Sequence, residues 1–162
     1  ILNPPKINEN LALRPGIMSY GYSPIENKNN YDLKPVMTLI TKVINLKKVP
    51  KNSGVSYGHT FITNKETILA TIPLGYGDGF PRILSNKFSV TINKKNFPQR
   101  GRISMDLAVI EVDNSVKLGD KVVIFGNKEK CINDANDLAK LSNTISYEIT
   151  TALTERVERI LK

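Results

Sequence analysis

The sequence has one cysteine, one histidine and no tryptophan among its 162 residues. A lone Cys131 cannot form an internal disulfide, and together with His59 it cannot supply the ligands of a typical zinc site. We therefore expect no metal, and we interpret His59 as an exposed loop residue. Ser104 has no plausible partner for nucleophilic catalysis, because a triad needs a positioned base and the sequence has a single histidine. Such sparse cysteine use is consistent with a reducing, cytoplasmic location.

Long apolar runs are also missing. No stretch approaches the 18 apolar residues of a membrane span, so we expect no membrane partner. The chain starts with ILNPPKINEN, which has neither the basic nor the apolar region of a signal peptide and no initiator methionine. This start indicates a cut through a larger polypeptide.

Basic residues are in excess, with a formal net charge of +8. Lysine and arginine can neutralise phosphates, so this charge raises the possibility of nucleic-acid binding. The lysines are scattered, however, and the two clusters at 47–51 and 93–95 lie beside turn residues, as in solvated hairpin tips. We expect no nucleic-acid partner, and a stand-alone basic β-barrel that binds single strands is the alternative from a different class.

From residue 35 onward, β-branched runs of strand length alternate with Gly, Asn, Asp or Pro. The runs are 36–49, 67–74, 88–95, 101–112 and 120–126. They predict an antiparallel β-barrel or sandwich over about 35–126. Residues 1–34, rich in Asn and Pro, are interpreted as irregular chain and linker.

The last quarter has helical character. Its apolar residues follow helical spacing, and two side chains are available as an N-cap. The apolar positions are Ala135, Leu138, Ala139 and Leu141, and the candidate caps are Asn133 and Asp134. We predict a helix from about 133 and a further turn or two from 146.

Three short motifs carry candidate chemistry. The glycines of GVSYGHTF (54–61) leave Tyr57 without bulky neighbours. In PLGYGDGFPR (73–82) the glycines are spaced G-x-G-x-G, which does not match a dinucleotide-binding loop, so alone it is a turn. RPGI (14–17) is a turn whose backbone N–H groups can hold an anion, but alone it is an exposed arginine before a turn.

In their order along the chain, these motifs resemble the C-terminal part of alanine racemase, a pyridoxal-phosphate-dependent family. The segments that carry the resemblance are 14–24, 33–61, 70–87, 101–112, 118–126 and 146–159. The resemblance implies a mainly β fold: an antiparallel, barrel-like C-terminal domain with short helices near its end, preceded by the last segment of an α/β (TIM) barrel. Residues 1–24 would be the tail of that barrel and a linker, and 25–162 the C-terminal β domain.

The resemblance also implies a function. The family interconverts L-alanine and D-alanine, a step of D-alanine biosynthesis for peptidoglycan, with two bases on opposite faces of a pyridoxal 5'-phosphate aldimine. It works as a head-to-tail homodimer in which Tyr57 would be the tyrosine base given to the partner subunit's active site. The motif of the Schiff-base lysine is absent from this chain, so we expect the fragment alone to be inactive. A broad-specificity or serine racemase of the same fold is the alternative.

The remaining site residues follow from the same resemblance. Arg14 would face the pyridine nitrogen of the cofactor, and Gly16 and Ile17 would donate backbone N–H groups to its phosphate. The backbone N–H of Met105 would meet the substrate carboxylate, and Tyr76 would narrow the substrate entrance. The corridor further out would be lined by Arg82, Arg102 and Leu153. Glu155 departs from the family pattern, because some members have a second gate tyrosine there.

Overall fold

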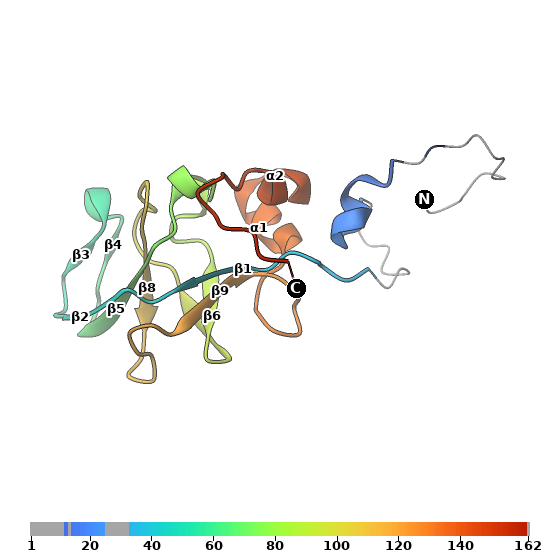
Figure 1. Ribbon diagram of the computed structural model, residues 1–162. Coiled ribbons are helices and arrows are strands. Elements are labelled where there is room, and N and C mark those ends of the chain that lie inside the picture. The colour runs from blue at the N-terminus through green and yellow to red at the C-terminus, as the bar shows by residue number, and fades with distance from the viewer. Residues whose placement is uncertain (1–11, 13, 25–32, 162) are drawn as a thin grey trace.

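The computed structural model describes residues 12, 14–24 and 33–161 of the chain (Figure 1). The described part is mainly β, as the sequence predicts. The proposed domain boundary after residue 24 borders residues 25–32, which lie outside the described residues, as do residues 1–11 and 13 of the proposed barrel tail. That boundary stays a prediction.

In the described residues, nine strands form antiparallel sheets of four, three and two strands. The four-stranded sheet has the order β1-β9-β6-β7, the three-stranded sheet has the order β2-β5-β8, and β3 pairs with β4. The bounds are β1 Leu39–Lys42, β2 Asn45–Val49, β3 Gly54–Val55, β4 Phe61–Ile62, β5 Thr67–Ile72, β6 Ser89–Ile92, β7 Lys95–Pro98, β8 Ala108–Val112 and β9 Lys121–Phe125.

The two larger sheets are joined at both edges without forming one continuous barrel. At one edge the chain passes directly from β1 to β2, where the Val43 amide donates to Asp120 and the next amide, of Ile44, donates to Thr71 of β5. At the other edge an isolated bridge between Gln99 and Ile110 links the end of β7 to β8. In place of a closed barrel, the described residues thus form two linked antiparallel sheets that share the main core.

The predicted strand at 36–49 is two strands of different sheets. A β-bulge lies between Leu39 and Ile40, and the chain changes sheet at Val43. The reason is geometric: a bend lets one apolar run serve two sheets, each pairing with its own neighbour. Periodicity along 36–49 does not reveal this bend.

The core lies between these sheets and the helices. Alternation in β8 puts Ala108, Ile110 and Val112 inside, whereas β5 is buried on both faces for most of its length. The rings of Phe80 and Phe88 pack in a tilted arrangement, with their centroids 5.2 Å apart, within the same core. Burying such side chains supplies about 1.5–3 kcal/mol each.

Helix α1 (Ala135–Ser142) covers one end of the core, followed by α2 (Ser146–Thr151) (Figure 1). Asp134 is the N-cap, and its carboxylate accepts a hydrogen bond from the Asp137 amide. The Asp137 carboxylate in turn accepts from the Asp134 amide, which completes a capping box. Ala135, Leu138 and Ala139 are buried as predicted, but Leu141 is 38% exposed. Since the helix ends at Ser142, Leu141 lies in its last turn, off the buried face.

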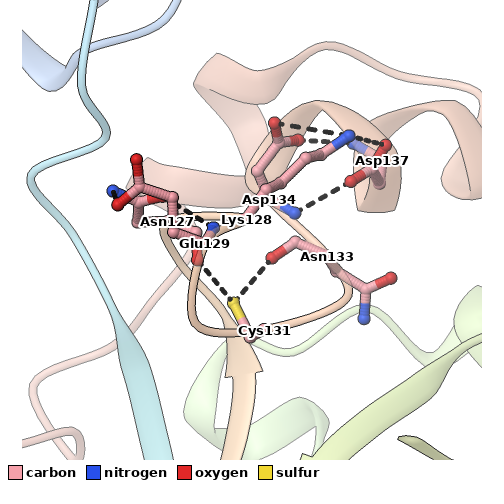
Figure 2. Close-up of polar contacts among 7 residues, drawn as sticks. All are labelled: Asn127, Lys128, Glu129, Cys131, Asn133, Asp134 and Asp137. Atoms are coloured by element: carbon pink, nitrogen blue, oxygen red, sulfur yellow. Dashed lines mark hydrogen bonds and ion pairs between the residues drawn. The ribbon is translucent and has the colours of Figure 1, made fainter.

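The loop before α1 is held by its own polar groups (Figure 2). The Cys131 thiol donates to the carbonyls of Asn127 and Asn133 at 3.3 and 3.2 Å, and Lys128 pairs with Asp137 at 2.9 Å. Burial is the largest cause that raises the pKa of Cys131. The single cysteine therefore has a structural place under the loop, and its thiolate is disfavoured.

The N-terminal segment is more ordered than the sequence predicts. Residues Gly16–Tyr20 form a 3-10 helix, η1, which ends at Gly21 in the left-handed conformation with φ of 81°. Ile17 and Tyr22 are each 2% exposed and belong to the main core. The expectation of irregular chain over 1–34 is wrong here, because tertiary burial orders a segment whose composition alone favours turns.

Candidate functional site

Tyr57 projects from the connection between β3 and β4. It starts the short 3-10 helix η2 (Tyr57–His59) and its side chain is 72% exposed. The small size of Gly54 is needed here, since a Cβ on Gly54 would lie 2.5 Å from the His59 ring. His59 is exposed, as predicted. The hairpin thus leaves the phenol uncovered by its own domain.

The residue before Tyr57 has an unusual backbone. Ser56 has φ of 60° and ψ of −169°, a region that is occupied almost only by glycine. Gly58 follows with φ of 68° and His59 with φ of 45°. Three residues around Tyr57 therefore lie at positive φ, and two of them have side chains.

The loop after β7 supports this hairpin from the side. The Ser56 hydroxyl donates to the Arg102 carbonyl at 2.6 Å. A Cβ on Gly58 would lie 2.9 Å from the Arg102 guanidinium, and one on Gly101 would lie 2.6 Å from the Val55 carbonyl oxygen. Arg102 is thereby next to the Tyr57 loop.

The Tyr76 loop contacts the same segment further along. The amides of Tyr76 and Gly77 donate to the carbonyls of Ser104 and Met105 at 3.1 and 2.8 Å. Gly75 has no room for a side chain, because its Cβ would lie 2.2 Å from the Met105 carbonyl oxygen. Tyr76 and Met105 are about half exposed, at 48% and 51%, so neither side chain is a core residue.

Arg156 joins these two loops electrostatically. Its guanidinium contacts Asp78 at 3.2 Å and Asp106 at 2.6 Å. Thr154 adds two bonds to the Tyr76 loop, from its amide to the Asp78 carbonyl and from its hydroxyl to the Gly77 carbonyl. The segment after α2 therefore fixes the geometry of both loops.

The two other corridor residues border the same cluster. Arg82 starts the 3-10 helix η4 (Arg82–Leu84), whose C-cap Ser85 accepts from the Ile103 amide at 3.0 Å. Leu153 lies against the Tyr76 loop, since a Cβ on Gly79 would lie 2.8 Å from its Cα. The structure thus brings together six predicted site residues: Tyr57, Tyr76, Arg82, Arg102, Met105 and Leu153.

The predicted cofactor residues are elsewhere. Arg14, Gly16 and Ile17 lie in or beside η1, which sits beyond the helical end of the domain, whereas the β3–β4 hairpin is at the opposite end (Figure 1). Gly16 has φ of 59°, and a Cβ on it would lie 3.5 Å from the Tyr147 hydroxyl. These three residues do not share one site with Tyr57 of the same chain.

Sequence reasoning missed the residues that hold the cluster together. Ser56, Thr154 and Arg156 contact loops that are 46 to 78 positions away in the sequence. Neither the hydroxyls nor the charge carry a local signal for such partners. Asp106 likewise has no partner nearby in the sequence, and its ion pair with Arg156 appears only in the fold.

Within 12, 14–24 and 33–161, no group of three or more His, Cys, Asp or Glu side chains is placed to hold a metal ion. The helices of that same part include none with the length and apolar character to cross a membrane. The site is therefore described by its aromatic, arginine and backbone groups.

Fold and site define a mainly β domain that displays a tyrosine and a set of arginines on exposed, mutually braced loops. Residues 36–161 match the sequence model of a family described as "Alanine racemase, C-terminal domain". The chain belongs to the alanine racemase family.

Curated relatives and solved structures agree with this assignment. The chain is 44% identical over 153 residues to an alanine racemase of Halothermothrix orenii, covering 93% of this chain and 40% of the relative. It superposes on the alanine racemase of Streptomyces coelicolor A3(2) with a TM-score of 0.86 at 40% identity, covering 91% and 40% of the two chains. For the alanine racemase of Bacillus anthracis, solved with bound L-Ala-P, the TM-score is 0.82 at 39% identity, covering 88% and 37%.

The chain therefore spans about two fifths of the length of the relatives it matches. These relatives are racemases, a class of isomerase. The mainly β C-terminal domain that the sequence predicts is confirmed by both the fold and the family match.

Proposed function

We propose that this chain is the part of an alanine racemase that supplies a tyrosine base to the active site of a partner subunit in a head-to-tail homodimer. One observation carries the proposal: the braced Tyr57 cluster and the Arg14–Ile17 segment lie at opposite ends of the same domain (Figure 1). A site that needs both sets of residues requires two chains. Each chain would then contribute its Tyr57 end to one site and its Arg14 end to another.

Tyr57 would move the proton at the substrate α-carbon on one face. Tyrosine ordinarily titrates near 10, so a tyrosine base near neutrality needs cations or donors that stabilise its phenolate. The exposed position of Tyr57 leaves the phenol open to such groups from a partner. The opposite face would be served by a lysine outside this chain.

The substrate would lie against the loops that Arg156 joins. Among the described residues, the Met105 N–H group donates no hydrogen bond to a backbone carbonyl. It is therefore suited to donate to the alanine carboxylate. Tyr76, fixed to the same loop through its amide, would narrow the entrance. Arg82, Arg102 and Leu153 would line the path outward, where the two guanidinium groups attract the carboxylate of the amino acid.

The residues at the other end fit pyridoxal 5'-phosphate. Gly16 is in the left-handed region, and within the described part neither the Gly16 nor the Ile17 N–H group donates to a backbone carbonyl. Gly16 is exposed and Ile17 is buried, so a phosphate would approach from the Gly16 side. Arg14 is exposed and would face the pyridine nitrogen as a permanent donor. When bound, the cofactor supplies an electron sink for the α-carbanion. Glu155 is exposed, and its carboxylate would have to point away from that phosphate.

Complementation by halves tests the proposal. This chain is mixed with the barrel portion of the racemase that bears the lysine, and D-alanine formation from L-alanine is measured with cofactor present. We expect no activity from either half alone and activity from the mixture. Tyr57→Phe keeps the ring and should lower activity at least a hundredfold, whereas Tyr76→Phe should lower it less. Full activity of the Tyr57→Phe mixture, with assembly verified by sedimentation, would exclude Tyr57 as the base.

Substrate class is tested in the same mixture. L-Serine replaces L-alanine at matched concentration, and the ratio of kcat/KM values separates an alanine racemase from a serine or broad-specificity enzyme of this fold. We expect alanine to be favoured, because the family relatives are alanine racemases. Equal values would favour the broad-specificity alternative.

A further inference from the structure

The backbone of Ser56 is held where side-chain-bearing residues are rarely found. With φ of 60° and ψ of −169°, its conformation costs about 1–3 kcal/mol for a residue other than glycine. Such a cost persists only where the surroundings impose the conformation. The next residue in the chain is Tyr57.

Two contacts hold Ser56 in place. Its hydroxyl donates to the Arg102 carbonyl at 2.6 Å, a bond that spans 46 positions of sequence. The second contact is with the Gly101 backbone, which packs closely against Ser56: a Cβ on Gly101 would lie 3.0 Å from the Ser56 Cβ. The 101–102 turn therefore fixes the position from which the Tyr57 side chain leaves the backbone.

From this geometry we propose that Ser56 is a positioning residue for Tyr57: its hydroxyl bond to the Arg102 carbonyl fixes the strained backbone that aims the phenol. The inference rests on the proposed function, because it concerns the residue proposed as the base. Without the bond, the peptide before Tyr57 is free to rotate and the phenol samples directions in which proton transfer is slow.

Two substitutions separate the orientation of the Tyr57 side chain from the stability of the fold. Ser56→Ala removes the hydroxyl but keeps the Cβ, so the strain remains. Ser56→Gly removes the hydroxyl and also the steric cost of positive φ. We expect Ser56→Gly to melt about 2 °C or more above Ser56→Ala, and yet to be the less active of the two.

The kinetic test uses the assembled racemase with bound cofactor. We expect kcat to fall about tenfold in Ser56→Ala and further in Ser56→Gly, with KM for alanine changed less than twofold. The isotope effect of α-deuterated alanine should rise only in the direction in which Tyr57 takes the proton. Ser53→Ala, which removes the bond from the Ser53 hydroxyl to the Pro50 carbonyl on the same hairpin, is the matched control and should keep parental kcat.

Each contrary outcome overturns the inference. If activity follows the melting order, so that Ser56→Gly is the more active variant, the serine has a purely structural role. The same conclusion follows if the Ser56 substitutions reduce activity equally in a Tyr57→Phe background, since positioning requires the phenol. Parental kcat in both Ser56 variants, with Tyr57→Phe inactive, refutes this inference alone, whereas an active Tyr57→Phe refutes the proposed function and the inference together.

Discussion

Tyr22 is a buried tyrosine, in contrast to the exposed Tyr57, and burial changes its pKa. It is 2% exposed, its hydroxyl has no side-chain or backbone partner that meets hydrogen-bond geometry in the described part, and burial raises its pKa to about 12. A folded-state pKa above the unfolded value near 10 means that the unfolded chain loses this proton first. The contribution of the protonated Tyr22 to the free energy of unfolding is therefore complete below about pH 10, and it is lost as the pH rises towards about 12.

We therefore predict an alkaline loss of stability that depends on Tyr22. Between pH 10 and 12 the free energy of unfolding should fall by on the order of 2 kcal/mol from this residue. Tyr22→Phe should remove that share of the pH dependence, as measured by urea unfolding at about pH 8, 10 and 12. The exposed Tyr20→Phe is the control, and an unchanged alkaline slope in Tyr22→Phe would contradict the assignment.

Gly75 is a second residue whose environment decides the outcome of a substitution. Its φ of −149° is extended, so the constraint is space, because a Cβ would lie 2.2 Å from the Met105 carbonyl oxygen. Gly75→Ala should separate the Tyr76 and Met105 loops and cost about 1–3 kcal/mol in urea unfolding. Gly119→Ala meets no atom within 4 Å and carries only the strain of its φ of 86°, so we expect the smaller cost there. The reverse order would argue against the steric account.

At the scale of the element, α1 depends on its first residue. Asp134 caps the helix through the Asp137 amide, so Asp134→Ala should lower the free energy of unfolding by about 1 kcal/mol. Lys128→Met is the control, because Lys128 is more than half exposed and such ion pairs contribute little. Equal losses in both variants would show that the ion pair, and not the cap, stabilises this end.

The elements were predictable where local signals agree. Runs of β-branched residues gave strands at β5, β6, β8 and β9, and helical spacing gave α1. The bend at Val43 and the 3-10 helix at Gly16–Tyr20 were not predictable, because each depends on partners distant in the sequence. The same is true of the site: motif order predicts Tyr57, but its support by Ser56 and Arg102 is tertiary.

For the whole molecule, the formal net charge is +8, and several of its lysines lie beside carboxylates. Lys48, Lys95 and Lys128 each pair with a carboxylate. We predict only weak, nonspecific binding of a single-stranded oligonucleotide by the isolated chain, in the range of about 10⁻⁴–10⁻⁶ M. Fluorescence anisotropy at 50 and 200 mM salt checks this, and tight, strongly salt-dependent binding would instead support the basic binding module.

At the scale of the whole molecule, the N-terminal segment is attached to the domain through the main core. Ile17 lies within η1 and Tyr22 follows its C-cap, and both belong to the same cluster as Ala135 and Leu138 of α1. Residues 36–161 hold nearly all of the remaining core, so a chain without residues 1–34 should still unfold cooperatively. It should do so at lower stability, by on the order of 3 kcal/mol for two lost apolar side chains, less the regained chain entropy.

Urea unfolding of the shortened chain and of Ile17→Ala in the full chain tests this coupling. Ile17→Ala should account for about half of the loss, because it removes one of the two anchors while the segment remains. If the shortened chain is as stable as the parent, η1 is only loosely attached and its Gly16 and Ile17 amides are not held in place by α1. If the loss is as predicted, the fold itself fixes the segment that would meet the cofactor, at the end of the domain opposite the tyrosine that we propose for the partner's site.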